Sequence, residues 1–188
     1  MITPFWRKEP LNDKETELLE ALFEGHRAAT RRQNISSEVL KAAYIGSGDF
    51  NQAVAAALCT LGGTHAPIIQ SYELLSGDTN IDYYLYREEK IPGWGSSFCK
   101  GKMDDILARW YDLLSYWPEM RAKIDETTIQ LHELGWNIFP NMASASAATG
   151  IVLKMSKEIT PMLFLAGRIE PWAEICYAIQ KSDQKTKV

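Results

Sequence analysis

Apolar side chains recur at three-to-four-residue spacing through most of this chain, and that spacing is what most constrains its fold. The clearest runs cover residues 18–23, 106–114 and 163–172. Such spacing gives each helix one apolar face, whereas the alternation that marks a half-buried strand is scarce here. The pattern predicts an all-α protein of about seven to nine helices.

Capping and breaking residues divide the periodic stretches into separate helices. Asn12 or Asp13 is placed to cap a first helix, which we expect to end at Gly25. A second helix is expected to begin near Ser36 or Ser37 and to stop at the glycines of residues 46–48. Further helices are expected over 50–61, over 68–75, from Asp104 or Asp105 to before Pro118, over 124–134, and from Thr160 and Pro161 onward.

Residues 50–61 form an alanine-rich segment that Asp49 is placed to cap. Four alanines between residues 53 and 57 leave little side-chain bulk on any face of this helix. Alanine favours the helix, but small side chains bury little area unless another backbone comes close. We therefore expect residues 50–61 to pack against their own copy in a two-fold homodimer.

The composition is that of a soluble globular protein, with 46% hydrophobic and 23% charged residues. A net charge of −4 and a pI near 5.5 argue against a nucleic-acid partner, which needs a basic face. The three cysteines form no CxxC pair, so neither a disulfide framework nor a metal site is indicated and a reducing cytoplasm is expected. No apolar run approaches the ~18 residues of a membrane span, so no membrane partner is expected.

Three sequence motifs stand in order along the chain. The first leads from alanines 55–57 into Leu-Gly-Gly-Thr-His-Ala at 61–66, and the second is Ile-Pro-Gly-Trp-Gly at 91–95. The third joins Phe-Pro-Asn at 139–141 to Thr-Pro at 160–161 and to Gly-Arg-Ile-Glu-Pro-Trp at 167–172. Together they resemble the citrate synthase family, with its alanine-rich helix and histidine turn, its proline-glycine loop and its arginine-containing last helix.

The resemblance spans about residues 34–172 and lacks the family's long N-terminal portion. It implies a citrate synthase-like helical fold, truncated at the N-terminus. A large-domain remnant would comprise residues 1–64 and 147–188, and a small domain that closes over the substrates would comprise residues 65–146. Family members also dimerise through helices that include the alanine-rich one.

The family's chemistry is the addition of acetyl-CoA to a ketone. A carboxylate base removes a methyl proton while a histidine donates a hydrogen bond to the thioester oxygen. The resemblance implies the histidine role for His65, and a hinge residue satisfied by backbone groups is the alternative. Ser96 replaces the ketone-polarising histidine and Ala143 replaces the catalytic aspartate, which implies a pseudoenzyme for citrate synthesis. Four aspartates of the implied small domain are candidates for a relocated base: Asp78, Asp82, Asp104 and Asp105.

The resemblance also implies ligand contacts, with a CoA thioester as co-substrate and no covalently bound cofactor. The expected CoA contacts are Trp94, Gly95 and Lys100, and the expected substrate contacts are Ser96, Asn141 and Arg168. Arg168 alone matches the family's carboxylate-binding arginines, and the alternative for it is a helix-end charge paired with Glu170 or Glu174. The family's substrate-binding histidine falls on Arg31.

Three classes of function fit these observations. The first is a degenerate citrate synthase-like protein without synthase activity that keeps an acyl-CoA or carboxylate pocket. The second is a compact acyl-CoA acyltransferase or lyase with a different acceptor and a relocated base. The third is a dimeric scaffold. In the first two classes, we expect His65, Trp94 and Arg168 to line one cleft.

Overall fold

The computed structural model describes residues 4, 6–32, 34–61 and 65–185. Within these ranges the chain is helical without any strand, which confirms the all-α prediction. The helices are α1 (Asp13–Thr30), α2 (Ile35–Ser47), α3 (Phe50–Leu58), α4 (Ile68–Ser76), α5 (Ile81–Tyr86), α6 (Ala108–Leu113), α7 (Pro118–Glu133), α8 (Met142–Val152) and α9 (Met162–Lys185). Two 3₁₀ turns, η1 (Asp105–Leu107) and η2 (Leu114–Tyr116), flank α6.

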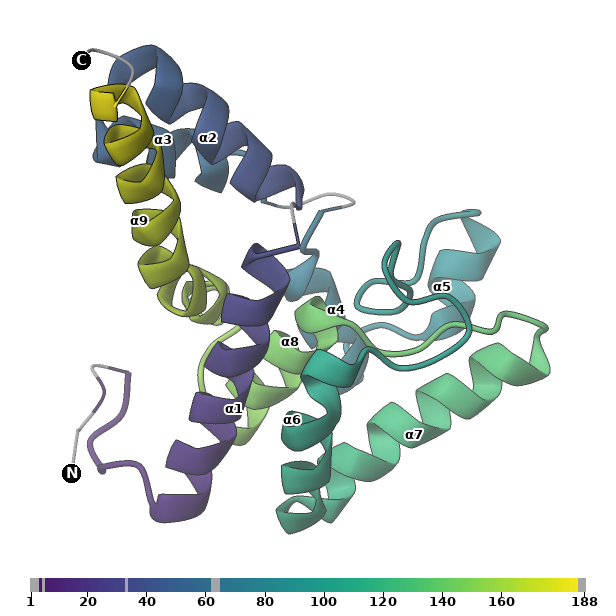
Figure 1. Cartoon of the computed structure of the whole chain (residues 1–188). Coiled ribbons are helices and arrows are strands. Elements are labelled where there is room, and N and C mark those ends of the chain that lie inside the picture. The colour runs from purple at the N-terminus through teal and green to yellow at the C-terminus, as the bar shows by residue number, and fades with distance from the viewer. Residues whose placement is uncertain (1–3, 5, 33, 62–64, 186–188) are drawn as a thin grey trace.

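The helices gather at two ends of the molecule (Figure 1). α2, α3 and the C-terminal part of α9 lie together at one end, while α5, α6 and α7 lie at the other. α8 forms the centre, because every residue from Ala143 to Gly150 is buried and α1, α4 and α9 all pack against it. Trp110 of α6 donates from Nε1 to Oγ1 of Thr149 at 2.9 Å. The small side chains of α8 allow its neighbours to approach closely.

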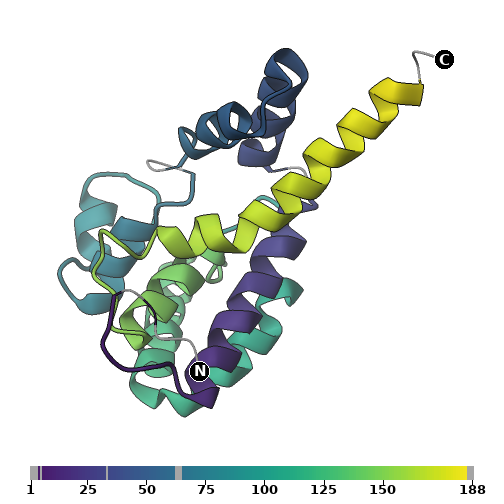
Figure 2. The same cartoon turned by 90° about the vertical axis from the view of Figure 1, so that its left-hand side faces the viewer.

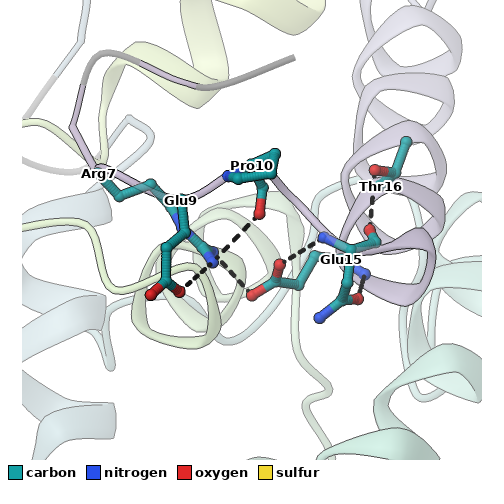
Figure 3. Close-up of polar contacts among 6 residues, drawn as sticks. Arg7, Glu9, Pro10, Glu15 and Thr16 are labelled. Atoms are coloured by element: carbon teal, nitrogen blue, oxygen red, sulfur yellow. Dashed lines mark hydrogen bonds and ion pairs between the residues drawn. The ribbon is translucent and has the colours of Figure 1, made fainter. Parts of the chain in front are cut away.

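A capping box begins α1 and confirms Asn12 as its cap, and Figure 3 shows Glu15, the other residue of the box. Asn12 Oδ1 accepts a hydrogen bond from the amide of Glu15 at 2.9 Å, and Glu15 Oε2 accepts one from the amide of Asn12 at 2.9 Å. Arg7 then donates from Nη1 to Glu15 Oε1 at 2.8 Å. These contacts fasten the segment before α1 to the helix.

The first two helices differ from prediction at one end each. α1 passes through Gly25, and close packing accounts for the glycine: a Cβ there would stand 3.2 Å from both the carbonyl oxygen of Ile106 and the sulfur of Met142. Gly25 therefore serves packing and does not end the helix. The cap of α2 is Asn34, not Ser36 or Ser37, and its Oδ1 accepts from the amide of Ser37 at 3.1 Å.

The alanine-rich helix α3 begins as predicted, since Asp49 Oδ1 accepts from the amide of Gln52 at 2.9 Å. It ends at Leu58 and not at residue 61, and the Gly62-Gly63 break lies outside the described residues. α3 packs against α2 and α9 of the same chain, with Ala53 and Ala57 fully buried. Small side chains thus permit close packing inside one chain, and the two-fold dimer stays a prediction.

In the middle of the chain, the periodicity missed one helix and misplaced the start of another. α5 has only six residues, too few to reveal a period, and begins at Asn80, whose Oδ1 accepts from the amide of Tyr83 at 3.0 Å. α7 begins at Pro118, earlier than the predicted residue 124, because proline's fixed φ suits a first helical position. Asp104 is a cap as predicted, but the helix after it is divided into η1, α6 and η2.

The last helix, α9, spans 24 residues and carries Pro171 inside it. It bends along its length (Figure 2), as a proline that removes a backbone donor predicts. α9 begins at Met162, and the predicted cap Thr160 instead donates its hydroxyl to the carbonyl of Ser156 at 2.9 Å. The first turns of α9 pack against α1 and α8 and carry Arg168 into the centre of the molecule.

The three cysteines, Cys59, Cys99 and Cys176, are free thiols. In the part of the chain that is described, every helix is too short or too polar to cross a membrane. The division into a large-domain remnant and a small domain stays a prediction.

Candidate active site

A cavity of about 1110 Å³ opens between the two ends of the molecule. Its walls come from the end of α1, the start of α2, the segment before α4, the loop of residues 88–98, the start of α8 and the first turns of α9. His65, Trp94 and Arg168 all line it, as we expected of a cleft. Gly95, Ser96 and Asn141 line it too, whereas Lys100 is exposed and is not part of its wall.

The proline-glycine loop is fixed in place by the segment before α8. The amide of Gly95 donates to the carbonyl of Phe139 at 2.8 Å, and the amide of Asn141 donates to the carbonyl of Gly93 at 2.8 Å. Gly93 and Gly95 have φ of 84° and 87°, values that favour glycine. At Gly93 a Cβ would also lie 2.7 Å from Ser71 Oγ. The second motif therefore forms a rigid wall of the cavity.

Two of the predicted ligand contacts are already engaged within the chain. Asn141 donates from Nδ2 to the carbonyl of Gly95 at 2.7 Å, and its Oδ1 accepts from the amide of Ala143 at 2.8 Å to cap α8. Trp94 is only 5% exposed, and its Nε1 donates to Thr128 Oγ1 at 3.0 Å. Both residues shape the cavity wall from positions held by intramolecular hydrogen bonds.

Arg168 is a buried cation without a carboxylate partner among the described residues. It is 4% exposed, its Nη1 donates to Ser36 Oγ at 3.1 Å, and its Nε has no described hydrogen-bond partner. Burial lowers the pKa of Arg168 to about 9, which leaves it charged at neutral pH. The alternative of a helix-end ion pair is wrong, because Glu170 pairs with Arg27 and Glu174 with Arg31, each at 3.6 Å.

A short relay holds this guanidinium in place. Ser36 accepts from Arg168 and donates its hydroxyl to Asn34 Oδ1 at 2.7 Å, while Asn34 Nδ2 donates to the carbonyl of Ala29 at 2.9 Å. On its other side the guanidinium carbon lies 4.0 Å from the centre of the Phe164 ring. Sequence reasoning did not identify Phe164, because an aromatic residue at helical spacing is most often part of the core.

His65 is half-buried at the cavity wall, and its Nε2 has no described hydrogen-bond partner. Its ring meets that of Phe164 edge-on, with centroids 6.4 Å apart. Burial lowers the pKa of His65 below its ordinary value, and the positive charge of Arg168 lowers it further. The imidazole is therefore neutral at pH 7, and a neutral imidazole offers one N–H donor.

A second arginine lines the cavity, but its charge is matched. Arg32 donates from Nη1 to both carboxylate oxygens of Asp104, at 2.8 and 2.6 Å. Burial by itself raises the pKa of Asp104, but the hydrogen bonds from Arg32 and from the amide of Ile106 outweigh it and hold that pKa below its usual value. Arg31, on which the family's histidine falls, is mostly exposed and lies outside the cavity wall.

Of the four candidate bases, Asp104 alone lines the cavity. Asp78, Asp82 and Asp105 are exposed, and Asp105 pairs with Lys102 at 3.6 Å. Ala143 presents a methyl group at the start of α8, so that part of the wall is apolar. In the described residues, no cluster of three or more His, Cys, Asp or Glu side chains is arranged to hold a metal ion.

Two solved structures with a similar arrangement of helices are a citryl-CoA lyase and an ATP citrate lyase. Citryl-CoA lyase from Hydrogenobacter thermophilus superposes with a TM-score of 0.72 and 18% identity over 90% of this chain and 70% of the lyase chain. A mutant ATP citrate lyase from Methanosaeta concilii, solved in complex with (3S)-citryl-CoA, superposes with a TM-score of 0.78 and 14% identity over 95% of this chain. These likenesses confirm the citrate synthase-like helical fold.

Sequence comparison adds nothing to this structural likeness. No protein-family model matches the chain, and no curated protein matches its sequence. The chain spans a third of the ATP citrate lyase chain, since the superposition covers 33% of it. The likeness therefore establishes the fold and does not establish a chemistry.

Proposed function

We propose that the cavity binds a CoA thioester together with a carboxylate-bearing ligand, and that the protein does not synthesise citrate. The observation that carries this proposal is Arg168, a buried guanidinium in the cavity wall whose Nε lacks a described partner. A buried charge is normally paired or hydrogen-bonded, because desolvation without compensation is expensive. A carboxylate in the cavity would give this guanidinium the anionic partner that it lacks among the described residues, through a charge-assisted bond.

His65 is assigned to the thioester end of the ligand. A neutral imidazole can donate a hydrogen bond to a carbonyl oxygen, and the buried Nε2 of His65, which has no described partner, is the atom proposed to do so. The donor would stabilise negative charge that grows on the oxygen when an enol or enolate forms. Trp94 and Gly95 of the fixed loop, with Lys100 outside the cavity wall, are the proposed CoA contacts.

Citrate synthesis lacks its usual groups in this cavity. Ala143 has no carboxylate to take the methyl proton, and Ser96 cannot act as a cationic donor to a ketone. Loss of a positioned base typically costs about 10²–10⁴-fold in rate. We therefore assign the protein to binding, or to a reaction other than citrate formation.

The binding proposal is tested by titrating the purified protein with a stable analogue of the acetyl-CoA enol. His65→Ala should weaken binding by about 0.5–1.5 kcal/mol, the value of one hydrogen bond. His132→Ala is the matched control, because this exposed histidine lies outside the cavity. Equal affinity of wild type and His65→Ala would contradict the role of His65, and no binding at all would favour the scaffold alternative.

A second candidate is a compact acyl-CoA lyase or acyltransferase with Asp104 as its base. Asp104 supports it as the one candidate aspartate in the cavity wall, and the two solved structures described above are lyases. The Arg32 ion pair weakens Asp104 as a base, which is why this candidate comes second. Exchange of acetyl-CoA methyl protons with solvent deuterium, lost in Asp104→Asn, would establish it over the binding proposal.

A further inference from the structure

The charges of Arg168, Arg32 and Asp104 in the cavity wall sum to one positive charge. Arg168 is unmatched among the described residues, whereas Arg32 donates to both oxygens of Asp104, so those two charges cancel. The imidazole of His65 is neutral at pH 7. Among the described residues, Arg168 is thus the one cation inside the cavity that is free to meet an anionic ligand.

The remaining charged groups of the cavity wall lie in solvent. Glu88, Glu89 and Lys90 line the cavity but are exposed, and Glu89 accepts from Arg87 at 2.8 Å. Exposed charges of mixed sign are screened by water and ions, and contribute little to the selection of a buried ligand. They do not provide a second buried cation.

The wall beyond Arg168 is largely apolar. Phe164 lies directly against the guanidinium, and Ala143 presents a methyl group where the family resemblance implies a carboxylate. Apolar side chains on the other elements continue this surface: Ile35, Ile91, Ile106, Leu107, Ile138 and Met142. A ligand carboxylate placed there would lose its water without gaining a charged partner.

We propose that the carboxylate-bearing ligand is a monocarboxylic acid with an apolar remainder, such as a short 2-oxo acid, and not a dicarboxylate. This proposal rests on the proposed function, because it takes Arg168 as the carboxylate contact. One carboxylate pairs with the unmatched guanidinium, and the apolar wall accepts a hydrocarbon end. Asp104 maintains this selectivity by holding Arg32 in an ion pair.

The test compares two acids with the same four-carbon backbone, 2-oxobutanoate and oxaloacetate, which differ by a methyl group against a second carboxylate. Their affinities are measured by calorimetry on the full chain, with and without acetyl-CoA. We expect 2-oxobutanoate to bind at least about tenfold more tightly, and Arg168→Gln to abolish that binding. Oxaloacetate binding as tightly as 2-oxobutanoate, or more tightly, would overturn the inference.

Two failures can be told apart. If oxaloacetate binds more tightly and Arg168→Gln abolishes binding of both acids, the proposed carboxylate site stands, and only the inference of a monocarboxylic ligand is wrong. If neither acid binds, or if Arg168→Gln leaves their binding unchanged, the proposed function fails as well.

A variant tests the role of Asp104. Asp104→Asn should free Arg32 from its ion pair and so raise the affinity for oxaloacetate, while the affinity for 2-oxobutanoate stays the same. The preference for 2-oxobutanoate over oxaloacetate should therefore become smaller. Adding Arg32→Gln to that variant should restore the original preference, and Asp105→Asn, at the exposed neighbour, should not alter it. An unchanged preference in folded Asp104→Asn would contradict the proposed control of Arg32. If that variant does not fold, the wild-type comparison still decides the ligand class.

Discussion

The guanidinium carbon of Arg168 lies 4.0 Å from the centre of the Phe164 ring, in the arrangement of a cation–π contact. The same ring meets His26 edge-on at 5.2 Å and His65 edge-on at 6.4 Å between centroids. The Phe164 ring is therefore in contact with the guanidinium of Arg168 and with the rings of both histidines. Because no acidic residue stands in this group, a change at Arg168 should be felt at the histidines.

Replacing Arg168 should raise the pKa of His65. Burial is the larger cause of the lowered pKa of His65, and the charge of Arg168 is the second cause. Arg168→Gln removes only the second, so the pKa should move part of the way back toward its ordinary value. A ¹H–¹⁵N NMR titration of the imidazole measures it. Arg27→Gln, which removes a surface charge, should leave the titration unchanged, and an unmoved pKa in Arg168→Gln would contradict the assigned coupling.

The free energy of unfolding should decrease as the pH is lowered, because of His26. Ser146 Oγ donates its one proton to the carbonyl of Met142 at 2.8 Å, so His26 Nε2 must donate to Ser146 Oγ, 2.9 Å away. The ring is neutral and fully buried, and its Nδ1 has no described partner. Burial first, and Arg168 second, lower the pKa of His26 well below its ordinary value.

The sign follows from proton uptake. Below about pH 6.5 the histidine is protonated in the unfolded chain, whereas His26 in the folded protein stays neutral. The free energy of unfolding therefore decreases as the pH falls from about 6.5 toward the pKa of folded His26. Above that range the contribution is fully present. Urea unfolding at pH 8, 6.5 and 5 should show this slope, and His26→Gln should reduce it. His65→Gln should reduce the pH dependence by less, because His65 is only half-buried. The same pH dependence in wild type, His26→Gln and His65→Gln would show that His26 is not its source.

Substitutions at two glycines of the cavity loop distinguish the effect of backbone conformation on stability from the effect of packing. Gly93 and Gly95 both have positive φ, but a Cβ at Gly93 would lie 2.8 Å from Cβ of Ser144, whereas at Gly95 the nearest atom, on Ile138, is 3.7 Å away. Gly93→Ala should therefore cost about 1–3 kcal/mol more than Gly95→Ala. Urea unfolding of the two variants measures the difference, and equal losses would show that the loop yields without resistance.

The sequence predicts those parts of the fold that are decided locally. Asn12 and Asp49 cap their helices through contacts three residues away, which a sequence pattern can reveal. The cavity depends on contacts between distant residues. Ser36 and Arg168 are 132 positions apart, and nothing near either residue specifies the other.

The family motifs still brought the correct residues to one place. His65, Trp94 and Arg168 were expected in one cleft and do line one cavity. The order of the motifs predicted this arrangement, which helical periodicity alone does not predict. Their chemical roles stay predictions. The Arg32–Asp104 ion pair was missed, since the resemblance directed attention to Arg31 and local pattern did not favour its neighbour.

Purified protein should form no citrate from acetyl-CoA and oxaloacetate. Ser96 and Ala143 occupy the positions where the resemblance implies the polarising histidine and the base, and the loss of cooperating groups leaves little beyond binding. A thiol-release assay measures the rate. Turnover of even ~1 s⁻¹, an ordinary enzyme rate, would overturn this interpretation of the cavity.

The protein is predicted to be a two-fold dimer through the outer face of α3. Ala53 and Ala57 are buried against helices of the same chain, so the partner has to meet the opposite face, where Gln52 and Ala55 are exposed. Small side chains there permit close approach of a second helix. Sedimentation at micromolar concentration should therefore give the mass of a dimer.

A matched pair of variants locates that interface. Ala55→Glu places a charge on the outer face of α3, where a symmetric contact would bring it close to its own copy, and should shift the protein to monomer without loss of helix content. Ala122→Glu makes the same change at an exposed position of α7, at the other end of the molecule (Figure 1), and should leave the dimer intact. A monomeric wild-type protein would refute the dimer, and a dimer that Ala55→Glu does not weaken would exclude α3 from its interface.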